Sequence, residues 1–92
     1  MANTIKLPAR MDLPAAQAFV NDLSACDFAN DITLDASEVT HLGALCVQAI
    51  IAGARSAKEA GGAFALKDTS EKVQEQLSLM GLTVEEIEGG VQ

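Results

Sequence analysis

The chain has 92 residues, of which 13 are acidic and 6 basic, so its formal net charge is -7. A chain of this length can form one compact domain but not two separate cores, and its 49% hydrophobic content is too high for a disordered protein. The excess of carboxylates excludes binding to a nucleic-acid backbone or an anionic membrane, because both would repel it.

Short strands alternate with helices along the chain, judged from the spacing of its apolar residues. In chain order the predicted elements are a strand at 4–7, a helix at 13–26, a strand at 32–34, a helix at 43–59, a strand at 63–66, a helix at 70–80 and an edge strand at 83–87. Asp12 and Ser70 are suited to cap the first and third helices, and Gly61 and Gly81 to end the second and third.

This alternation with short connections predicts an α/β domain, in which a mostly parallel or mixed sheet of about four strands is covered by three or four helices. Residues 1–92 are expected to form a single domain with its core at about 4–82 and a flexible tail at 88–92. Val73, Leu77 and Met80 are expected to line the inner face of the third helix.

The expected location is the cytoplasm. No segment is long and apolar enough to span a bilayer, and the N-terminus lacks the hydrophobic core of a signal peptide. Cys26 and Cys46 lie far apart within apolar stretches, which is typical of small buried hydrophobic residues rather than of a disulfide or a metal site.

The second predicted helix has an unusually wide apolar surface. Small and aliphatic side chains form most of its circumference. Ile51 lies between Lys58 and Arg55 on the helical wheel, and Leu45 lies near the opposite border. One interpretation is that these two residues pack beneath loops or are ordinary exposed hydrophobic residues. The other is that they belong to a surface on which another protein docks.

The sequence lacks the residue patterns that are typical of enzyme active sites. His41 is the only histidine, has no nucleophile in an evident motif nearby and has no second histidine with which to hold a metal. The run 31–35 lacks the ligand spacing of a calcium loop, and the glycines at 61–62 lack the pattern of a phosphate loop. The sequence therefore predicts no catalytic site, no metal site and no cofactor.

Several segments resemble, in order and spacing, those of a known family. Residues 7–12 resemble the Leu-x-Gly-x-Leu-Asp segment that opens STAS domains, with Ala9 in place of glycine. Residues 32–42 resemble the hydrophobic strand of that family and its Asp-x-Ser-x-Val turn, and 60–82 follow in the same order. The resemblance covers about 4–82 and implies a STAS-like fold, with the strand that usually comes first missing or reduced.

STAS domains include the anti-sigma-factor antagonists, which bind or release a kinase-like anti-sigma factor. In that group an Asp-Ser-Ser-Gly loop opens the second helix, and phosphate on its first Ser adds nearly two negative charges at a helix N-terminus. Here Ala44 aligns with the phosphorylated Ser, and Gly43 replaces the Asp. Because alanine has no hydroxyl, the phospho-switch cannot operate at this position.

The segment 42–48 is similar to short STAS proteins of bacterial chemotaxis systems, which implies a histidine kinase or a response regulator as partner. Our hypothesis is a non-enzymatic bacterial signalling adaptor that binds a kinase, an anti-sigma factor or a response regulator through the start of its second helix. The expected partner contacts are Thr40, His41, Leu42, Gly43, Ala44, Leu45, Val47 and Ile51, with Asp12 and Ser37 at the rim.

Two alternatives remain open. Ser37 or Thr40 could receive a phosphate in place of Ala44, although such residues commonly do no more than hydrogen-bond their own turn. The family resemblance also fits the STAS subunit of a membrane lipid-transport complex, which stabilises an ATPase partner.

Overall fold

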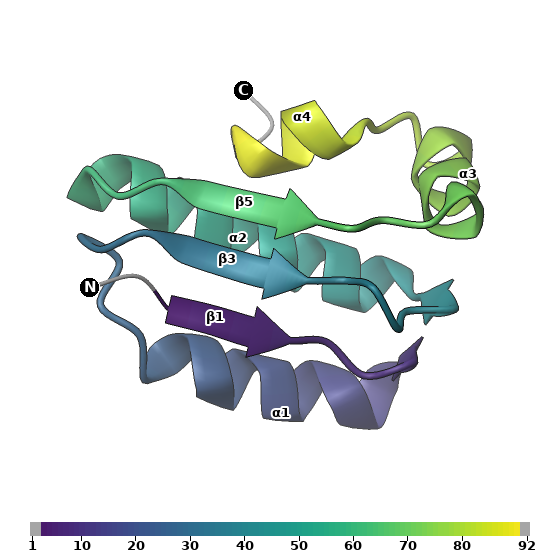
Figure 1. Cartoon of the computed structure of the whole chain (residues 1–92), viewed down its shortest axis with the longest axis horizontal. Coiled ribbons are helices and arrows are strands. Elements are labelled where there is room, and N and C mark those ends of the chain that lie inside the picture. Colours follow the sequence, from purple (N-terminus) through teal and green to yellow (C-terminus); the bar gives the residue numbers. More distant parts are fainter. Residues whose placement is uncertain (1–2, 91–92) are drawn as a thin grey trace.

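The computed structural model describes residues 3–90, which form two parallel sheets and four helices (Figure 1). The main sheet contains β1 (Asn3–Lys6), β3 (Ile32–Asp35) and β5 (Phe64–Lys67) in the order β1-β3-β5. A smaller sheet pairs β2 (Arg10–Met11) with β4 (His41–Leu42). The helices are α1 (Leu13–Ser24), α2 (Ala44–Ala60), α3 (Glu71–Leu79) and α4 (Val84–Glu88).

The main sheet buries one face and leaves the other more exposed. In the strand register Ile5 is level with Leu34 and Leu66, and these side chains point towards the helices. The neighbouring row contains Lys6 and Lys67, both exposed. Figure 1 shows α1 and α2 behind the sheet. Side chains alternate between the two faces of a strand, so the apolar residues face these helices and the polar residues face away from them.

The predicted α/β class and the mainly parallel pairing are confirmed, but the main sheet has three strands rather than about four. The expected edge strand at 83–87 is wrong, because this segment forms α4. Its start is a capping box: the Glu86 N–H donates to Thr83 Oγ1 at 3.1 Å, and the Thr83 N–H donates to Glu86 Oε1 at 3.1 Å. Two satisfied N–H groups favour a helix here.

The helix ends agree with the sequence in most places. Ser70 caps α3 by accepting a hydrogen bond from the Val73 N–H at 3.2 Å. Asp12 occupies the cap position of α1, but its side chain makes no capping hydrogen bond. Because α3 ends at Leu79, Met80 lies at the cap position after the helix and is 40% exposed. The prediction that Met80 lines the inner face of this helix is therefore wrong.

The segment after α4 is held against the fold. The Leu66 N–H on β5 donates to Glu88 Oε2 at 2.7 Å, and Arg55 Nε on α2 donates to the Gly90 carbonyl at 2.8 Å. Gly90 is buried. Part of the segment 88–92, which the sequence predicts to be a flexible tail, thus contacts β5 and α2 through Glu88 and Gly90, and residues 91–92 lie outside the described part of the chain.

Both cysteines are free thiols. Cys46 is fully buried, as expected for a small hydrophobic residue, and its S–H donates to the Asp12 carbonyl with a sulfur–oxygen distance of 3.4 Å. Burial, reinforced by the nearby Asp12 carboxylate, raises the pKa of this thiol. Cys26 is half-buried against the core. Within residues 3–90, no helix is long and apolar enough to cross a membrane.

Candidate docking site

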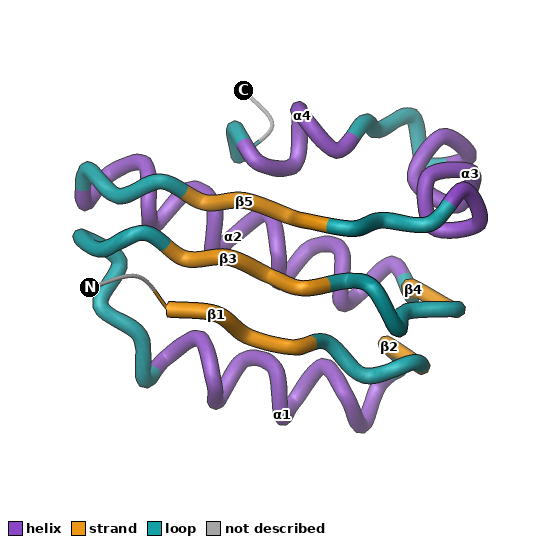
Figure 2. The backbone as a smooth tube through the Cα atoms, in the orientation of Figure 1, coloured by secondary structure: helices purple, strands orange, loops and turns teal. Residues whose placement is uncertain are grey.

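The first turns of α1 and α2 are joined into one surface by the small sheet. Its two strands align Arg10 with His41 and Met11 with Leu42, directly before the two helices begin (Figure 2). The Gly43 N–H donates to the Met11 carbonyl at 2.9 Å, which fixes the start of α2 beside the start of α1. Two loops that lie about thirty residues apart in sequence thus present a single face.

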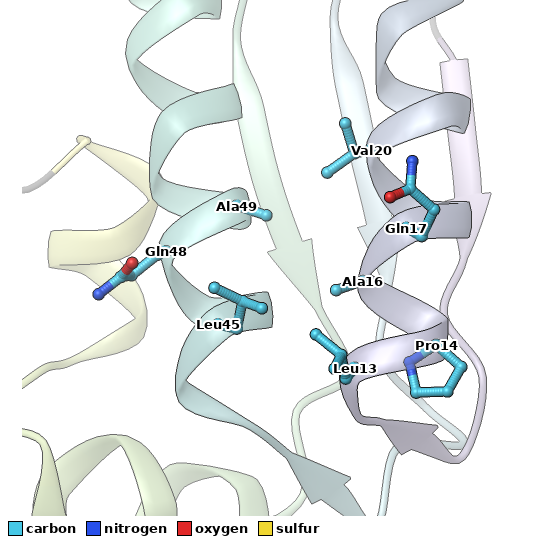
Figure 3. A pocket seen from close by; sticks show the side chains of 8 residues that line it. All are labelled: Leu13, Pro14, Ala16, Gln17, Val20, Leu45, Gln48 and Ala49. Atoms are coloured by element: carbon cyan, nitrogen blue, oxygen red, sulfur yellow. The ribbon is translucent and has the colours of Figure 1, made fainter.

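An apolar groove of about 580 Å³ lies between α1 and α2 (Figure 3). Leu13 and Val20 on α1 and Leu45 on α2 border it, and all three are exposed large hydrophobic residues. Ala16 and Ala49 approach the gap from opposite helices. The residues that line it are Leu13, Pro14, Ala16, Gln17, Val20, Leu45, Gln48 and Ala49.

A second hollow continues the groove towards the C-terminal ends of both helices. It shares Val20 and Ala49 with the first and is lined by Val20, Leu23, Ser24, Phe28, Ala49, Ala52, Gly53 and Ser56. No charged residue lines either hollow. We call the two hollows together the α1–α2 groove. Leu13, Val20 and Leu45, three of the five exposed large hydrophobic side chains of the described residues, line it.

Four of the expected partner contacts are exposed in this region. Thr40, His41, Ala44 and Leu45 face solvent, and Leu45 is 53% exposed. Gly43 beside them is half-buried. These residues lie just before β4, in β4 and in the first turn of α2, so they are available to a protein that approaches this end of the molecule.

Two other expected contacts, Leu42 and Val47, are only 3% and 2% exposed and cannot touch a partner directly. Leu42 lies in β4, where its N–H donates to Gln76 Oε1 of α3 at 2.7 Å. Val47 lies on the core face of α2. Both residues support the surface from below, and Ile51 is half-buried against the core.

Leu13 and Val20 were missed as surface residues. The sequence places them on the buried face of the first helix, but the centre of that face is Ala16, Phe19 and Leu23. At 100° per residue, Val20 lies about 100° and Leu13 about 120° to one side of Phe19. The width of the apolar arc on this helix could have indicated their exposure, because the arc is wider than the surface that one packed neighbour covers.

Ser37 and Thr40, the two candidate alternative phosphosites, both take part in hydrogen bonds. The Ser37 N–H donates to Asp35 Oδ1 at 2.9 Å, and the Thr40 hydroxyl donates to the Ala9 carbonyl at 3.1 Å. Both residues are exposed. The Ser37 contact is that of a turn-forming residue, whereas the Thr40 contact ties the segment before α2 to the loop that follows β1.

The turn at Ser37 makes stability depend on pH. Hydrogen bonds from the Ser37 backbone and side chain hold the pKa of Asp35 below its ordinary value. A carboxylate with a lowered pKa in the folded state stabilises the fold above its unfolded pKa, and this contribution is lost as the pH falls through the folded pKa. We expect Asp35→Asn to lose less stability than the wild type between about pH 6 and about pH 3, measured by urea unfolding. Equal losses in the two proteins would contradict this role.

Catalytic or metal chemistry has no visible support at this site. His41 is exposed, and among residues 3–90 no group of three or more His, Cys, Asp or Glu side chains is placed to hold a metal ion. What the site offers is an exposed, largely apolar groove with no charged lining residue, flanked at the start of α1 by the Arg10–Asp12 ion pair. Such a surface is suited to contact with another macromolecule.

The comparison with protein families identifies the class. A family model described as "Mlab, STAS domain" matches residues 2–88, which is nearly the whole chain. The chain therefore belongs to the STAS domain family, as the sequence motifs predicted. STAS domains are generally non-enzymatic regulatory domains that act through protein–protein contacts in signalling or partner switching. No curated protein and no solved structure matches the chain significantly.

Proposed function

We propose that this STAS domain is a non-enzymatic adaptor of a bacterial signalling pathway, in chemotaxis or partner switching. It binds a histidine kinase, an anti-sigma factor or a response regulator in the cytoplasm through the loop before α2 and the first turn of that helix. The observation that carries the proposal is Leu45, a large apolar side chain 53% exposed beside an uncharged groove in a chain of net charge -7. Exposed apolar surface of this kind is typical of protein contacts.

We propose that phosphorylation at the start of α2 does not regulate docking. Ala44 occupies the first turn, where the aligned family position carries the phosphorylated Ser, and Gly43 gives the helix no side-chain cap. A phosphate at this end of the helix would be attracted by the helix dipole and would place charge in the docking face. Without a hydroxyl at Ala44, that route to partner release is closed.

Direct binding measurements test the proposal. The purified protein is titrated by calorimetry with the kinases, anti-sigma factors and response regulators encoded near its gene, and with any lipid-transport ATPase encoded there. Binding to one of the signalling proteins is expected. Binding to the ATPase alone would overturn the signalling role and favour the subunit of a transport complex.

Ala44→Asp is expected to weaken partner binding at least tenfold, or about 1.4 kcal/mol, because it places an unpaired carboxylate in an apolar contact. The fold should be retained, since an acidic residue in the first turn of a helix is favourable by about 0.3–1 kcal/mol. Calorimetry gives the affinity, and urea unfolding gives the stability.

Ala44→Ser is the matched control for this variant. It restores the hydroxyl of the family position without adding charge, and we expect its affinity for the partner to stay within about twofold of wild type. An unchanged affinity in Ala44→Asp would remove Ala44 from the docking face.

A further inference from the structure

We infer that the element of the partner that docks here is an amphipathic helix with an apolar face and basic flanks, lying lengthwise in the α1–α2 groove. This inference rests on the proposed function and extends the contact from the first turn of α2 to the whole length of α1. Three observations carry it: the shape of the groove, the small residues along it and the charges around it.

The groove has the length and profile that a helix needs. Its lining runs from Leu13 to Ser24, the full 12 residues of α1, which is about 18 Å at 1.5 Å per residue. That distance equals about three turns of a docked helix. Leu13, Val20 and Leu45 form the sides, as Figure 3 shows, so apolar side chains spaced three and four residues apart could insert between them.

Small residues line the groove on the α2 side. Ala49 and Ala52 lie one turn apart, and Ala52 is exposed. Gly53 beside them is buried and serves internal packing, because a Cβ atom there would lie 3.0 Å from Leu23 Cδ1 and 3.3 Å from Phe64 Cε2. Small side chains let another helix approach closely, which increases the contact area that each partner side chain gains.

The surrounding charge favours a basic partner. The segment 12–31, which contains α1, carries four aspartates and no Lys, Arg or His; they are Asp12, which pairs with Arg10 Nε at 3.5 Å, and Asp22, Asp27 and Asp31. On the other side of the groove, α2 carries no charge from 44 to 54, and Arg55 near the far end donates to the Gly90 carbonyl at 2.8 Å. With a net charge of -7 for the whole chain, lysine and arginine at the edges of a docked helix are attracted, and glutamate or aspartate there is repelled.

A peptide titration tests the charge and the location together. The probe is a model helix of about 18 residues with leucine at every third or fourth position and lysine at the flanks. A second probe has glutamate in place of every lysine. Heteronuclear NMR of the labelled protein is expected to show shifts along both helices, including at Val20, Ala49 and Ala52. The lysine probe should bind at least tenfold more tightly, and its affinity should fall as salt rises.

Three results would overturn the inference: no shifts with the lysine probe, shifts confined to another surface, or equal affinity for the two probes. Equal affinity would indicate an unselective apolar patch. Binding of the protein to anionic lipid vesicles that displaces the lysine probe would also overturn it, because the groove would then be a membrane contact.

A variant in the middle of the groove, where its two hollows meet, separates this inference from the proposed function. Val20→Glu lies about two turns from the start of α1, on a side chain that is 43% exposed. We expect it to weaken binding of both the lysine probe and the signalling partner at least tenfold. Leu79→Glu, on the exposed surface of α3, is the matched control and should change neither.

The two failures are distinct. If Ala44→Asp weakens partner binding but Val20→Glu does not, the lengthwise helix is wrong and docking at the start of α2 stands. If the partner binds equally well to both variants, the proposed docking face itself is wrong. Circular dichroism and urea unfolding of each variant confirm that a loss of binding is not a loss of fold.

Discussion

Gly62→Ala is expected to lower the free energy of unfolding by about 3 kcal/mol, the upper part of the range for overpacked sites. A Cβ atom at this position would lie 2.2 Å from the Phe28 carbonyl oxygen and 2.7 Å from that of Asn30. Both obstacles are backbone atoms. The turn that carries them is fixed, since Asp27 accepts hydrogen bonds from the Asn30 N–H at its carbonyl and from the Ala29 N–H at Oδ1, each at 3.0 Å.

Gly61→Ala is the matched control, one residue away. Gly61 has φ of +87° and ends α2, but a Cβ atom there would meet nothing within 4 Å. The cost is the left-handed backbone alone, about 1–2 kcal/mol. Urea unfolding followed by far-ultraviolet circular dichroism measures both variants. If Gly62→Ala costs no more than Gly61→Ala, close backbone approach is not what requires the second glycine.

These two glycines show where the sequence was sufficient and where it was not. The pair indicated a helix end, and Gly61 supplies it: the Gly62 N–H donates to the Ala57 carbonyl and the Gly61 N–H to that of Lys58. Such local geometry can be predicted because it depends on neighbouring residues only. Glycine is required at position 62 because of a turn more than thirty residues earlier in the chain. The residues next to Gly62 therefore give no indication of this requirement.

In the fold as a whole, features set by neighbouring residues could also be predicted, and features set by distant contacts could not. Helix caps, glycine stops and alternating strands gave the α/β class and the position of most elements. The segment at 83–87 forms a helix rather than the expected strand because Thr83 and Glu86 stand at capping-box spacing, a local signal that outweighs the irregular spacing of Val84 and Ile87. The strands of two residues at Arg10 and His41 exist only through their pairing, and the sequence of either gives no independent signal.

The candidate site was predicted on one helix and missed on the other. Leu45 was found because its place at the edge of an apolar arc is a property of α2 alone. Leu13 and Val20 lie at the edge of an equally clear arc, but which edge stays uncovered depends on where α2 packs against α1. The burial of Leu42 and Val47 also depends on packing, by α3 and by the sheet. Helical periodicity defines an apolar face but not how much of it a neighbour covers.

Leu45→Asp is expected to have the largest effect on function, a loss of partner affinity of at least a hundredfold, or about 2.7 kcal/mol. The substitution removes an apolar anchor at the centre of the proposed contact and leaves a carboxylate with no partner when water is excluded. The fold should be unaffected, because Leu45 is 53% exposed and an acidic residue in the first turn of α2 suits the helix dipole.

Leu79→Asp makes the same chemical change on a different surface and distinguishes a local effect from a general one. Leu79 is 89% exposed on α3 and lines neither part of the α1–α2 groove. Both variants add one negative charge to a chain of net charge -7, so any long-range repulsion of the partner should weaken them equally. A hundredfold loss in Leu45→Asp with less than about twofold in Leu79→Asp identifies direct contact at α2. Equal losses would mean that the net charge of the domain, rather than this surface, governs binding.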